Sequence, residues 1–243
     1  MNKPFLSVII PAYNEVRRLP LTLVDIDAHL SKETYSYEIL VVDDGSTDTT
    51  ADMVRRFLPL VKNLRLLQLP KNQGKGAAVR YGMQEAHGNV RLFTDADNST
   101  SLDQFNGMLP LFKEGYAVLI GSRGAPGAVM DPSQSFFRRT VGRAGNLLIR
   151  VIAVPDILDT QCGFKAFTEE AAQKIFSLAR VDGWGFDVET LALASAMGFR
   201  VKEVPVRWRD SSFSHLTPFD YPRVLWETLK IRWWISHHGY RLD

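Results

Sequence analysis

The sequence predicts an α/β fold, in which helices flank a mostly parallel β-sheet. Short apolar runs alternate with helical patterns through the first half of the chain. These runs are continuous, which is typical of parallel strands covered on both faces. A polar cluster follows each of five runs, at the edge where open α/β sheets bind their ligands. The 243 residues, 45% hydrophobic and 23% charged, suffice for one large core.

The first half of the chain is predicted to begin in a βαβαβ order. Apolar, β-rich runs predict strands at 5–10, 37–42, 64–69, 90–94 and 116–121. Apolar spacing predicts four helices between these strands. The first carries Leu19, Leu23, Ile26 and Leu30, the second spans 49–61, the third spans 76–87, and the fourth carries Leu102, Phe105, Leu109 and Phe112.

After about residue 124 the pattern changes. A Gly/Pro/Ser-rich loop comes first, followed by an Arg-rich helix, the polar cluster DTQCGFK (159–165), another helix and a last strand in RVKEVPV (200–206). The chain has no repeat and no low-complexity segment, so we expect one domain over 1–243 with a remodelled C-terminal third.

Composition excludes several classes of protein. The 29 basic and 27 acidic residues give a net charge of +2, which is too balanced for bulk nucleic-acid binding. The single cysteine, Cys162, excludes an intrachain disulfide framework, and the five histidines lack zinc-site spacing. Neither a signal peptide nor an apolar segment of membrane-spanning length is apparent. We therefore expect a cytoplasmic protein whose metal, if any, has oxygen ligands.

The stretch TDADNS (94–99) places two carboxylates, Asp95 and Asp97, directly after the strand 90–94. Side chains two residues apart on an extended segment point to the same side, so the two negative charges converge and need a partner. With Asn98 and Ser99 beside them, they suit Mg²⁺ or Mn²⁺, which binds one or two carboxylates together with substrate phosphate oxygens. The pattern therefore predicts a phosphorylated ligand.

Two further loops complete this interpretation. Lys75 lies between Gly74 and Gly76 and offers a compact positive charge to a phosphate. Asp43 and Asp44 are better placed to accept hydrogen bonds from a base N–H or a ribose hydroxyl. The stretch DGSTDT alone is equally typical of a turn and a helix N-cap. Five polar loops at one sheet edge favour a nucleoside diphosphate site.

Five motifs in order carry a family resemblance: SVIIPAYNE, EILVVDDGSTDTT, NQGKGAAVRYGM, TDADNS and GSR. Over roughly residues 5–235 the chain resembles the family 2 glycosyltransferases with the GT-A fold, most of all the polyprenyl-phosphate glycosyltransferases that glucosylate dolichyl phosphate. The resemblance implies inverting transfer of a hexose, glucose before others, from a nucleotide sugar, UDP-linked before GDP-linked. It also implies a divalent metal, a donor-binding half over 1–123 and an acceptor half over 124–243.

The resemblance also implies roles for individual residues. In the donor half, Pro11, Tyr13 and Glu15 would frame the nucleotide, Asp44 would reach the base with Asp43 in support, and Gly74 and Lys75 would meet the phosphates. Asp95, Ala96 and Asp97 match the family's acidic motif, with Asp97 the direct metal ligand and Arg123 facing the phosphates. In the acceptor half, Gln161 and Lys165 would lie near the donor sugar or the acceptor, and Asp187 and Glu189 are the candidate catalytic acids.

The chemistry of the acceptor decides whether a general base is needed. A phosphate monoester, with a second pKa of about 6, is already a nucleophile at neutral pH. Such a reaction needs positive charge, which Arg138 and Arg139 of the Arg-rich helix would supply to the acceptor phosphate. The alternative is a soluble saccharide or small hydroxyl acceptor, which would require Asp187 or Glu189 as a base. A solvated helix face and helix N-terminal acids are the plainer interpretations of these residues.

Residues 221–238, YPRVLWETLKIRWWISHH, predict a basic amphipathic helix. Trp226 and Trp233 fall on its apolar side, whereas Trp234 falls on the charged side and is harder to bury. We expect this helix to rest on a membrane surface, which would make the protein peripheral on the cytoplasmic face. The chain departs from its relatives in having Ser214-His215 where they have Ser-Lys, which weakens one basic acceptor contact.

Three other classes fit less well. A nucleotidyltransferase would carry a Gly-rich loop after the first strand, where this chain has PAYNE (11–15). A phospho-receiver module would carry its acidic pair after the first strand rather than the second. An inactive binding protein is disfavoured by the full set of acidic and basic residues.

Overall fold

The computed structural model describes residues 3–131, 136–209 and 220–241; of 136–144, 220 and 221 it describes the backbone alone. Within these ranges one seven-stranded sheet has the order β3-β2-β1-β4-β7-β5-β8. Its strands are β1 Leu6–Ala12, β2 Tyr37–Asp43, β3 Leu64–Gln68, β4 Val90–Thr94, β5 Val118–Ser122, β7 Phe164–Thr168 and β8 Val201–Pro205. Two short strands, β6 Val129–Met130 and β9 Arg207–Trp208, pair beside it.

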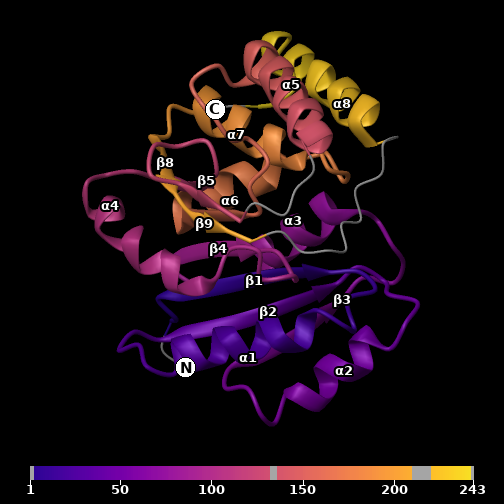
Figure 1. Ribbon diagram of the computed structural model, residues 1–243, viewed down its shortest axis with the longest axis vertical. Helices are drawn as coiled ribbons and strands as arrows, with labels where there is room; N and C mark the ends of the chain where they lie inside the picture. The colour runs from indigo at the N-terminus through magenta and orange to yellow at the C-terminus, as the bar shows by residue number, and fades with distance from the viewer. Residues whose placement is uncertain (1–2, 132–135, 210–219, 242–243) are drawn as a thin grey trace.

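Helices cover both faces of the sheet (Figure 1). One face packs on the helices α1 Leu19–Leu30, α2 Thr50–Phe57, η1 Leu102–Gly107 and α4 Leu109–Lys113. The other face packs on α3 Lys75–Glu85, α6 Glu169–Leu178 and α7 Phe186–Ala196. Two further helices, α5 Phe136–Ala153 and α8 Asp220–Ser236, pack on each other and on α7 as an outer layer.

The predicted mostly parallel sheet is confirmed, with one strand missed. β7 runs antiparallel between β4 and β5, with Lys165 opposite Phe93 of β4. From its sequence this segment is expected to be a polar cluster, and a lysine in the middle of a five-residue run is atypical of a buried strand. Lys165 is nevertheless fully buried, since it has an acidic partner inside the protein.

The predicted helix over Leu102 to Phe112 is wrong in type. It consists of the 3-10 helix η1 followed by the short α4. Pro110 falls in the first turn of α4, and a proline cannot donate a backbone hydrogen bond to the preceding turn. The apolar side chains still pack on the core as their spacing predicted.

The strand directions bring the polar loops together. β1 to β5 all point the same way, so the loops that follow them meet at one edge of the sheet. Because β7 is antiparallel, it starts at this same edge, where Phe164 pairs with Thr94. The segment 159–163 therefore joins the loops that follow β4 and β5.

The helix α8 differs from the prediction at one side chain, Trp234. Its core side carries Val224, Thr228 and Ile231, which are buried. Trp234, expected to resist burial, is half-buried and makes an edge-to-face contact with Tyr240, their centroids 5.8 Å apart. Trp226 and Trp233 point outward, 59% and 57% exposed. In the described ranges, no helix combines the length and apolarity that crossing a bilayer requires.

Candidate active site

Each carboxylate after β4 faces a basic side chain from another loop. Lys75, in the first turn of α3, places its Nζ 2.5 Å from Asp95 Oδ1. Arg18, at the start of α1, places a guanidinium nitrogen 3.4 Å from Asp97 Oδ2. Between the two carboxylates, the carbonyl of Ala96 accepts the hydroxyl of Thr22 at 2.7 Å. The negative charges of Asp95 and Asp97 are therefore each paired with one positive charge.

Sequence reasoning missed Arg18. Its guanidinium grips Glu15 with two nitrogens, one of them Nε, 2.7 Å from Oε2. A forked pair of this kind fixes the orientation of both side chains. The available signal was the spacing of three residues between Glu15 and Arg18, which becomes informative only once Asp97 is known to lie beside them.

Lys75 lies on Asp95 rather than in an open phosphate cradle. Its ammonium is 5.3 Å from the ring centroid of Trp184 and 5.9 Å from that of Phe186. Burial would lower the pKa of Lys75, but the charges of Asp95 and Asp187 raise it above its ordinary value. The side chain is therefore an ammonium at neutral pH.

Asp44 organises the loop that precedes Lys75. Its two oxygens accept the backbone N–H groups of Gln73 and Gly74, both at 2.8 Å. Gly74 has a φ of +112°, and a β-carbon there would lie 2.4 Å from the carbonyl oxygen of Asp182. Burial raises the pKa of Asp44, and the two N–H bonds oppose it. Each oxygen keeps a lone pair with which it could accept from a ligand.

The first two loops are tied together by Asn14, which sequence reasoning also missed. Its side-chain oxygen accepts the N–H groups of Thr47 and Asp48, at 2.9 and 3.2 Å. Its own N–H donates to Ser46 at 2.9 Å. The predicted nucleotide residues lie on either side of this link: Pro11, Tyr13 and Glu15 in one segment and Asp43 and Asp44 in the other.

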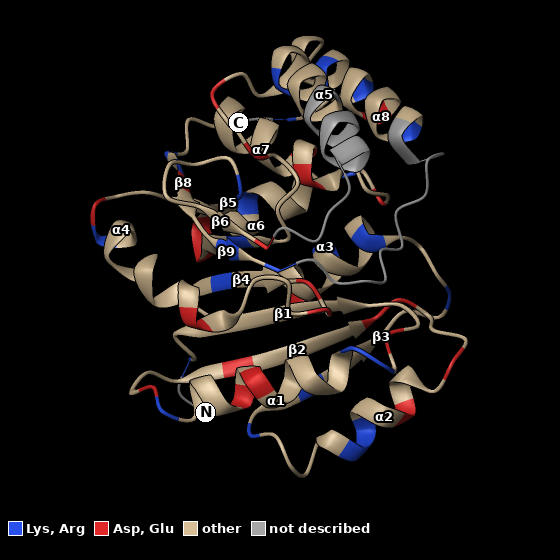
Figure 2. Cartoon of the chain, in the orientation of Figure 1, with Lys and Arg blue, Asp and Glu red and all other residues tan. Residues whose placement is uncertain are grey.

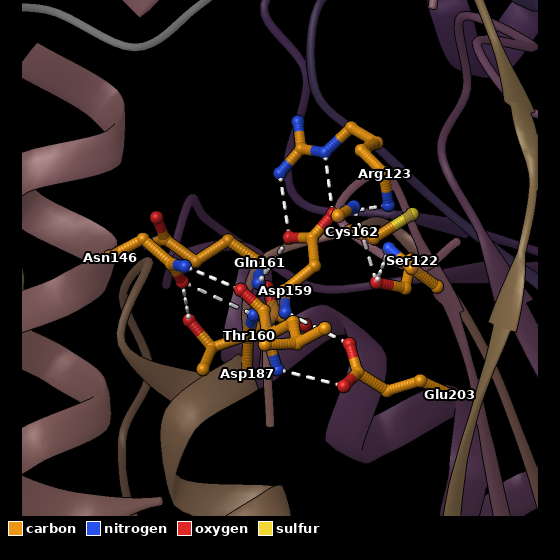
Figure 3. Close-up of polar contacts among 12 residues, drawn as sticks. Ser122, Arg123, Asn146, Asp159, Thr160, Gln161, Cys162, Asp187 and Glu203 are labelled. Carbon is orange, nitrogen blue, oxygen red and sulfur yellow. Dashed lines mark hydrogen bonds and ion pairs between the residues drawn. The ribbon is translucent and has the colours of Figure 1, made fainter. Parts of the chain in front are cut away.

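Arg123, which follows β5, is half-buried and forms an ion pair with the buried Asp159 (Figure 3). The guanidinium donates to both carboxylate oxygens at 2.7 and 2.9 Å, and the backbone N–H of Arg123 adds a third bond at 2.9 Å. Burial would raise the pKa of Asp159, but Arg123 lowers it below its usual range. Trp208 covers the guanidinium, 5.5 Å from its ring centroid.

The segment 158–161 is held on two other sides (Figure 3). Glu203 of β8 accepts the N–H groups of Leu158 and Asp159, at 2.8 and 3.0 Å. Asn146 of α5 accepts the hydroxyl of Thr160 at 2.9 Å. Half-buried Gln161, a predicted site residue, sits in this braced segment. α5 is thereby attached to the edge of the site.

Lys165 and Asp187 form an ion pair beneath this edge. Both are buried, and the ammonium also donates to the carbonyl of Cys162 at 2.7 Å. Burial raises the pKa of Asp187, against the opposing effects of Lys165 and Lys75. Asp187, a predicted candidate base, is thus a counter-ion in this structure.

Glu189 lies two residues after Asp187 in the first turn of α7 and serves another purpose. Its carboxylate accepts the N–H groups of Arg180 and Val181, at 2.8 and 2.9 Å, and the hydroxyl of Tyr240 at 2.6 Å. It is fully buried, and burial raises its pKa despite these three bonds. Glu189 thereby connects the C-terminal segment to the loop after α6.

The predicted acceptor residues Arg138 and Arg139 lie in the first turn of α5. Their side chains are outside the described residues, as are Ser214 and His215. Their roles stay predictions.

Asp95 and Asp97 can bind a metal ion only together with ligands from outside the protein. Among the described residues, no three acidic, histidine or cysteine side chains converge on a common point. Asp95 and Asp97 alone supply oxygen ligands, the type that Mg²⁺ and Mn²⁺ prefer. A cation bound there would take its remaining ligands from water or from a phosphorylated substrate.

Comparison with known proteins relates the chain to one family. The family model described as "Glycosyl transferase family 2" matches residues 7–176. Two relatives named dolichyl-phosphate beta-glucosyltransferase, from Dictyostelium discoideum and Drosophila melanogaster, are 38% and 39% identical over 227 residues. Those alignments cover 88% of this chain and 69% and 70% of the relatives.

Solved structures agree on the fold. Glucosyl-3-phosphoglycerate synthase from Mycobacterium tuberculosis superposes with a TM-score of 0.67 at 20% identity, over 94% of this chain and 80% of that one. A second structure of that enzyme, in complex with Mn²⁺, UDP and glucosyl-3-phosphoglycerate, gives 0.66 at 18%, over 94% and 78%. The GT-A fold expected from the five motifs is confirmed.

Proposed function

The chain belongs to glycosyl transferase family 2, and from that premise we propose that it transfers glucose from UDP-glucose to dolichyl phosphate or a similar polyprenyl phosphate. Its relatives in Dictyostelium and Drosophila carry the name of this reaction. The observation that carries the proposal is the meeting of Asp95, Asp97, Lys75 and the Arg123 loop at one edge of the sheet. Residues 1–123 would bind the donor and 124–243 the acceptor.

The donor is a nucleoside diphosphate sugar in this proposal. Asp44 would accept from the base, while Lys75 and Arg123 would face the diphosphate. Asp95 and Asp97 would hold Mg²⁺ or Mn²⁺, which would offset the charge that develops on the departing diphosphate. The complex of the mycobacterial enzyme with Mn²⁺ and UDP supports this choice of ligands by analogy of fold.

A phosphate acceptor suits the surroundings of the two candidate bases. Asp187 is paired with Lys165, and the carboxylate of Glu189 accepts three hydrogen bonds. Neither arrangement favours removal of a proton from a hydroxyl acceptor. A phosphate monoester needs no such step, because it is already ionised. It needs positive charge, which Arg138 and Arg139 would provide.

The outer helices would rest on a membrane, where a polyprenyl phosphate resides. Exposed apolar side chains lie on both helices, namely Leu147, Leu148 and Val151 on α5 and Trp226, Leu229 and Trp233 on α8. Basic residues recur along α8 (Figure 2). Tryptophan with basic residues is typical of helices at lipid interfaces.

Transfer from labelled UDP-glucose tests the proposal. The purified protein would be mixed with detergent-dispersed dolichyl phosphate, dolichol or a soluble disaccharide, each with Mn²⁺. We expect glucosylation of dolichyl phosphate alone, and faster transfer from UDP-glucose than from GDP-mannose. Transfer to the disaccharide but not to the lipid phosphate would favour the hydroxyl-acceptor alternative instead.

Liposome flotation tests the membrane surface separately. The double variant Trp226→Ser/Trp233→Ser should lose binding to vesicles that contain anionic lipid. Leu21→Ser/Leu60→Ser is the control, because both leucines are exposed but lie on the opposite side of the sheet from α8. Equal loss of binding in both double variants would contradict the proposal.

A further inference from the structure

The two carboxylates after β4, Asp95 and Asp97, are here called the acidic pair. Lys75 contacts Asp95 at 2.5 Å, and Arg18 contacts Asp97 at 3.4 Å. The two basic residues come from different loops, the first at the start of α3 and the second at the start of α1. Both ion pairs are partly shielded from solvent.

Each basic residue is also fixed by a second group. Arg18 is gripped by Glu15, so its guanidinium is oriented toward Asp97. Lys75 approaches the rings of Trp184 and Phe186, which limit where its ammonium can go. The two positive charges are therefore built into the protein and are not chance contacts of long surface side chains.

A metal ion that approaches the acidic pair meets these positive charges. Both repel a divalent cation, and partly buried charges interact more strongly than charges in water. Within the described residues no third acidic, histidine or cysteine side chain joins the acidic pair, so the protein supplies no further ligand that would favour a metal ion over the two cations already in place. A diphosphate changes this balance, because its negative oxygens can attract the basic side chains and complete the coordination of the metal.

We propose that Arg18 and Lys75 are resident counter-ions of the acidic pair, which make metal binding conditional on the nucleoside diphosphate. This inference rests on the proposed function and deepens it, since it adds Arg18 as a positioning residue and orders the binding of metal and donor. When a diphosphate enters, Lys75 turns from Asp95 toward phosphate oxygens. Metal and nucleotide then bind cooperatively, and each raises the affinity for the other by the same factor.

The affinity for Mn²⁺ alone is the decisive measurement, because it requires neither sugar transfer nor lipid. Electron paramagnetic resonance of free Mn²⁺ would give Kd with and without saturating UDP. For the wild type we expect binding about 50-fold tighter with UDP than without, within the usual range of coupling between sites. Lys75→Met should tighten the binding of Mn²⁺ alone by about tenfold, since one repelling charge is gone.

Arg18 needs a variant that controls for Glu15. Arg18→Gln would remove the guanidinium that pairs with Glu15, and the carboxylate of Glu15 would then add to the negative charge that attracts Mn²⁺. The double variant Glu15→Gln/Arg18→Gln keeps the net charge of the wild type, and we expect it also to bind Mn²⁺ alone about tenfold more tightly. Thermal unfolding would verify that each variant is folded.

Matched controls exist in the same loops. Arg17→Gln removes an exposed positive charge next to Arg18, and Lys71→Met removes an exposed positive charge from the loop that leads to Lys75. Both should bind Mn²⁺ alone as weakly as the wild type. If they tighten binding as much as Lys75→Met, the effect is one of general charge and the proposal is wrong.

Two other outcomes separate this inference from the proposed function. If wild type binds Mn²⁺ equally well with and without UDP, the counter-ion proposal fails even where glucose transfer to dolichyl phosphate is observed. If UDP tightens Mn²⁺ binding in the wild type and Lys75→Met binds Mn²⁺ alone more tightly, but no transfer to the lipid phosphate is observed, the counter-ions stand and the acceptor assignment fails.

Discussion

The α-carbon of Gly163 lies against the carboxylate of Asp95, so closely that a β-carbon there would stand 1.9 Å from Oδ2. The two residues also share a backbone hydrogen bond, from the N–H of Asp95 to the carbonyl of Gly163 at 3.2 Å. The start of β7 thereby sets where the first carboxylate of the acidic pair can point.

Gly163→Ala should displace Asp95 and weaken UDP-dependent Mn²⁺ binding by about tenfold or more, because a misplaced ligand loses most of its contact with a metal. Calorimetric titration of Mn²⁺ in the presence of UDP would measure the loss. Gly107→Ala is the control, since a β-carbon at Gly107 would meet nothing within 4 Å. Equal affinity in both variants would show that Asp95 does not hold the metal.

Asp97→Ala should abolish glucose transfer and leave the fold intact, because the carboxylate lies at the sheet edge and not in the apolar core. Turnover and thermal unfolding, measured on the same preparation, separate the two effects. Asp103→Ala removes an exposed carboxylate from the next segment and should stay active. Full activity of the wild type in excess chelator would contradict the assignment of a metal to Asp95 and Asp97.

Lys165→Met should lower the free energy of unfolding by about 3–5 kcal/mol, because it leaves Asp187 as an uncompensated buried charge. The double variant Lys165→Met/Asp187→Leu replaces the pair by apolar groups and should recover most of this loss. Urea denaturation of wild type, the two single variants and the double variant completes the cycle. Additive effects of the two single substitutions would contradict a coupled pair.

Glu189→Gln should keep appreciable transfer to dolichyl phosphate while it loses about 1–3 kcal/mol of stability, the usual cost of disturbing hydrogen bonds to a buried charge. Its carboxylate bonds the backbone at Arg180 and Val181 and the hydroxyl of Tyr240. Glu170→Gln, exposed on α6, is the control for stability. Near-total loss of turnover without loss of stability would identify Glu189 as a base.

Arg139→Ala should raise the apparent KM for the lipid phosphate, or lower kcat/KM, by roughly ten- to a hundredfold, because a charge-assisted contact is worth about 1.5–3 kcal/mol. UDP affinity should not change. Steady-state kinetics with varied dolichyl phosphate would measure the effect, with the exposed Arg56→Ala as control. If Arg138 and Arg139 can both be replaced without effect, the acceptor phosphate is held elsewhere.

Local pattern predicted the sheet and the clustering of its loops, because strands such as 90–94 are apolar and the polar residues that follow them break the run. It could not predict which partner each charged side chain takes. Arg18 and Asp97 are distant in sequence, and Asp187 and Glu189 differ in role although they share one helical turn. Those differences depend on what packs beside each residue.

Lys165 and Trp234 are more buried than their sequence positions predict, and the reason is again the partner of each side chain. General preferences place lysine outside and treat a tryptophan on a charged helix side as exposed. Inside this protein, Asp187 compensates the lysine, and Tyr240 packs against the tryptophan. A single sequence reveals neither partner.

The antiparallel insertion of β7 bears on how the chain is synthesised. β5 pairs with β7 and β8, and both follow it in the sequence, so no neighbour awaits β5 when it leaves the ribosome. β4 also keeps one open edge until β7 arrives. We therefore expect nascent chains that end before residue 164 to expose the unpaired edges of β4 and β5. Such chains should either bind chaperones or aggregate.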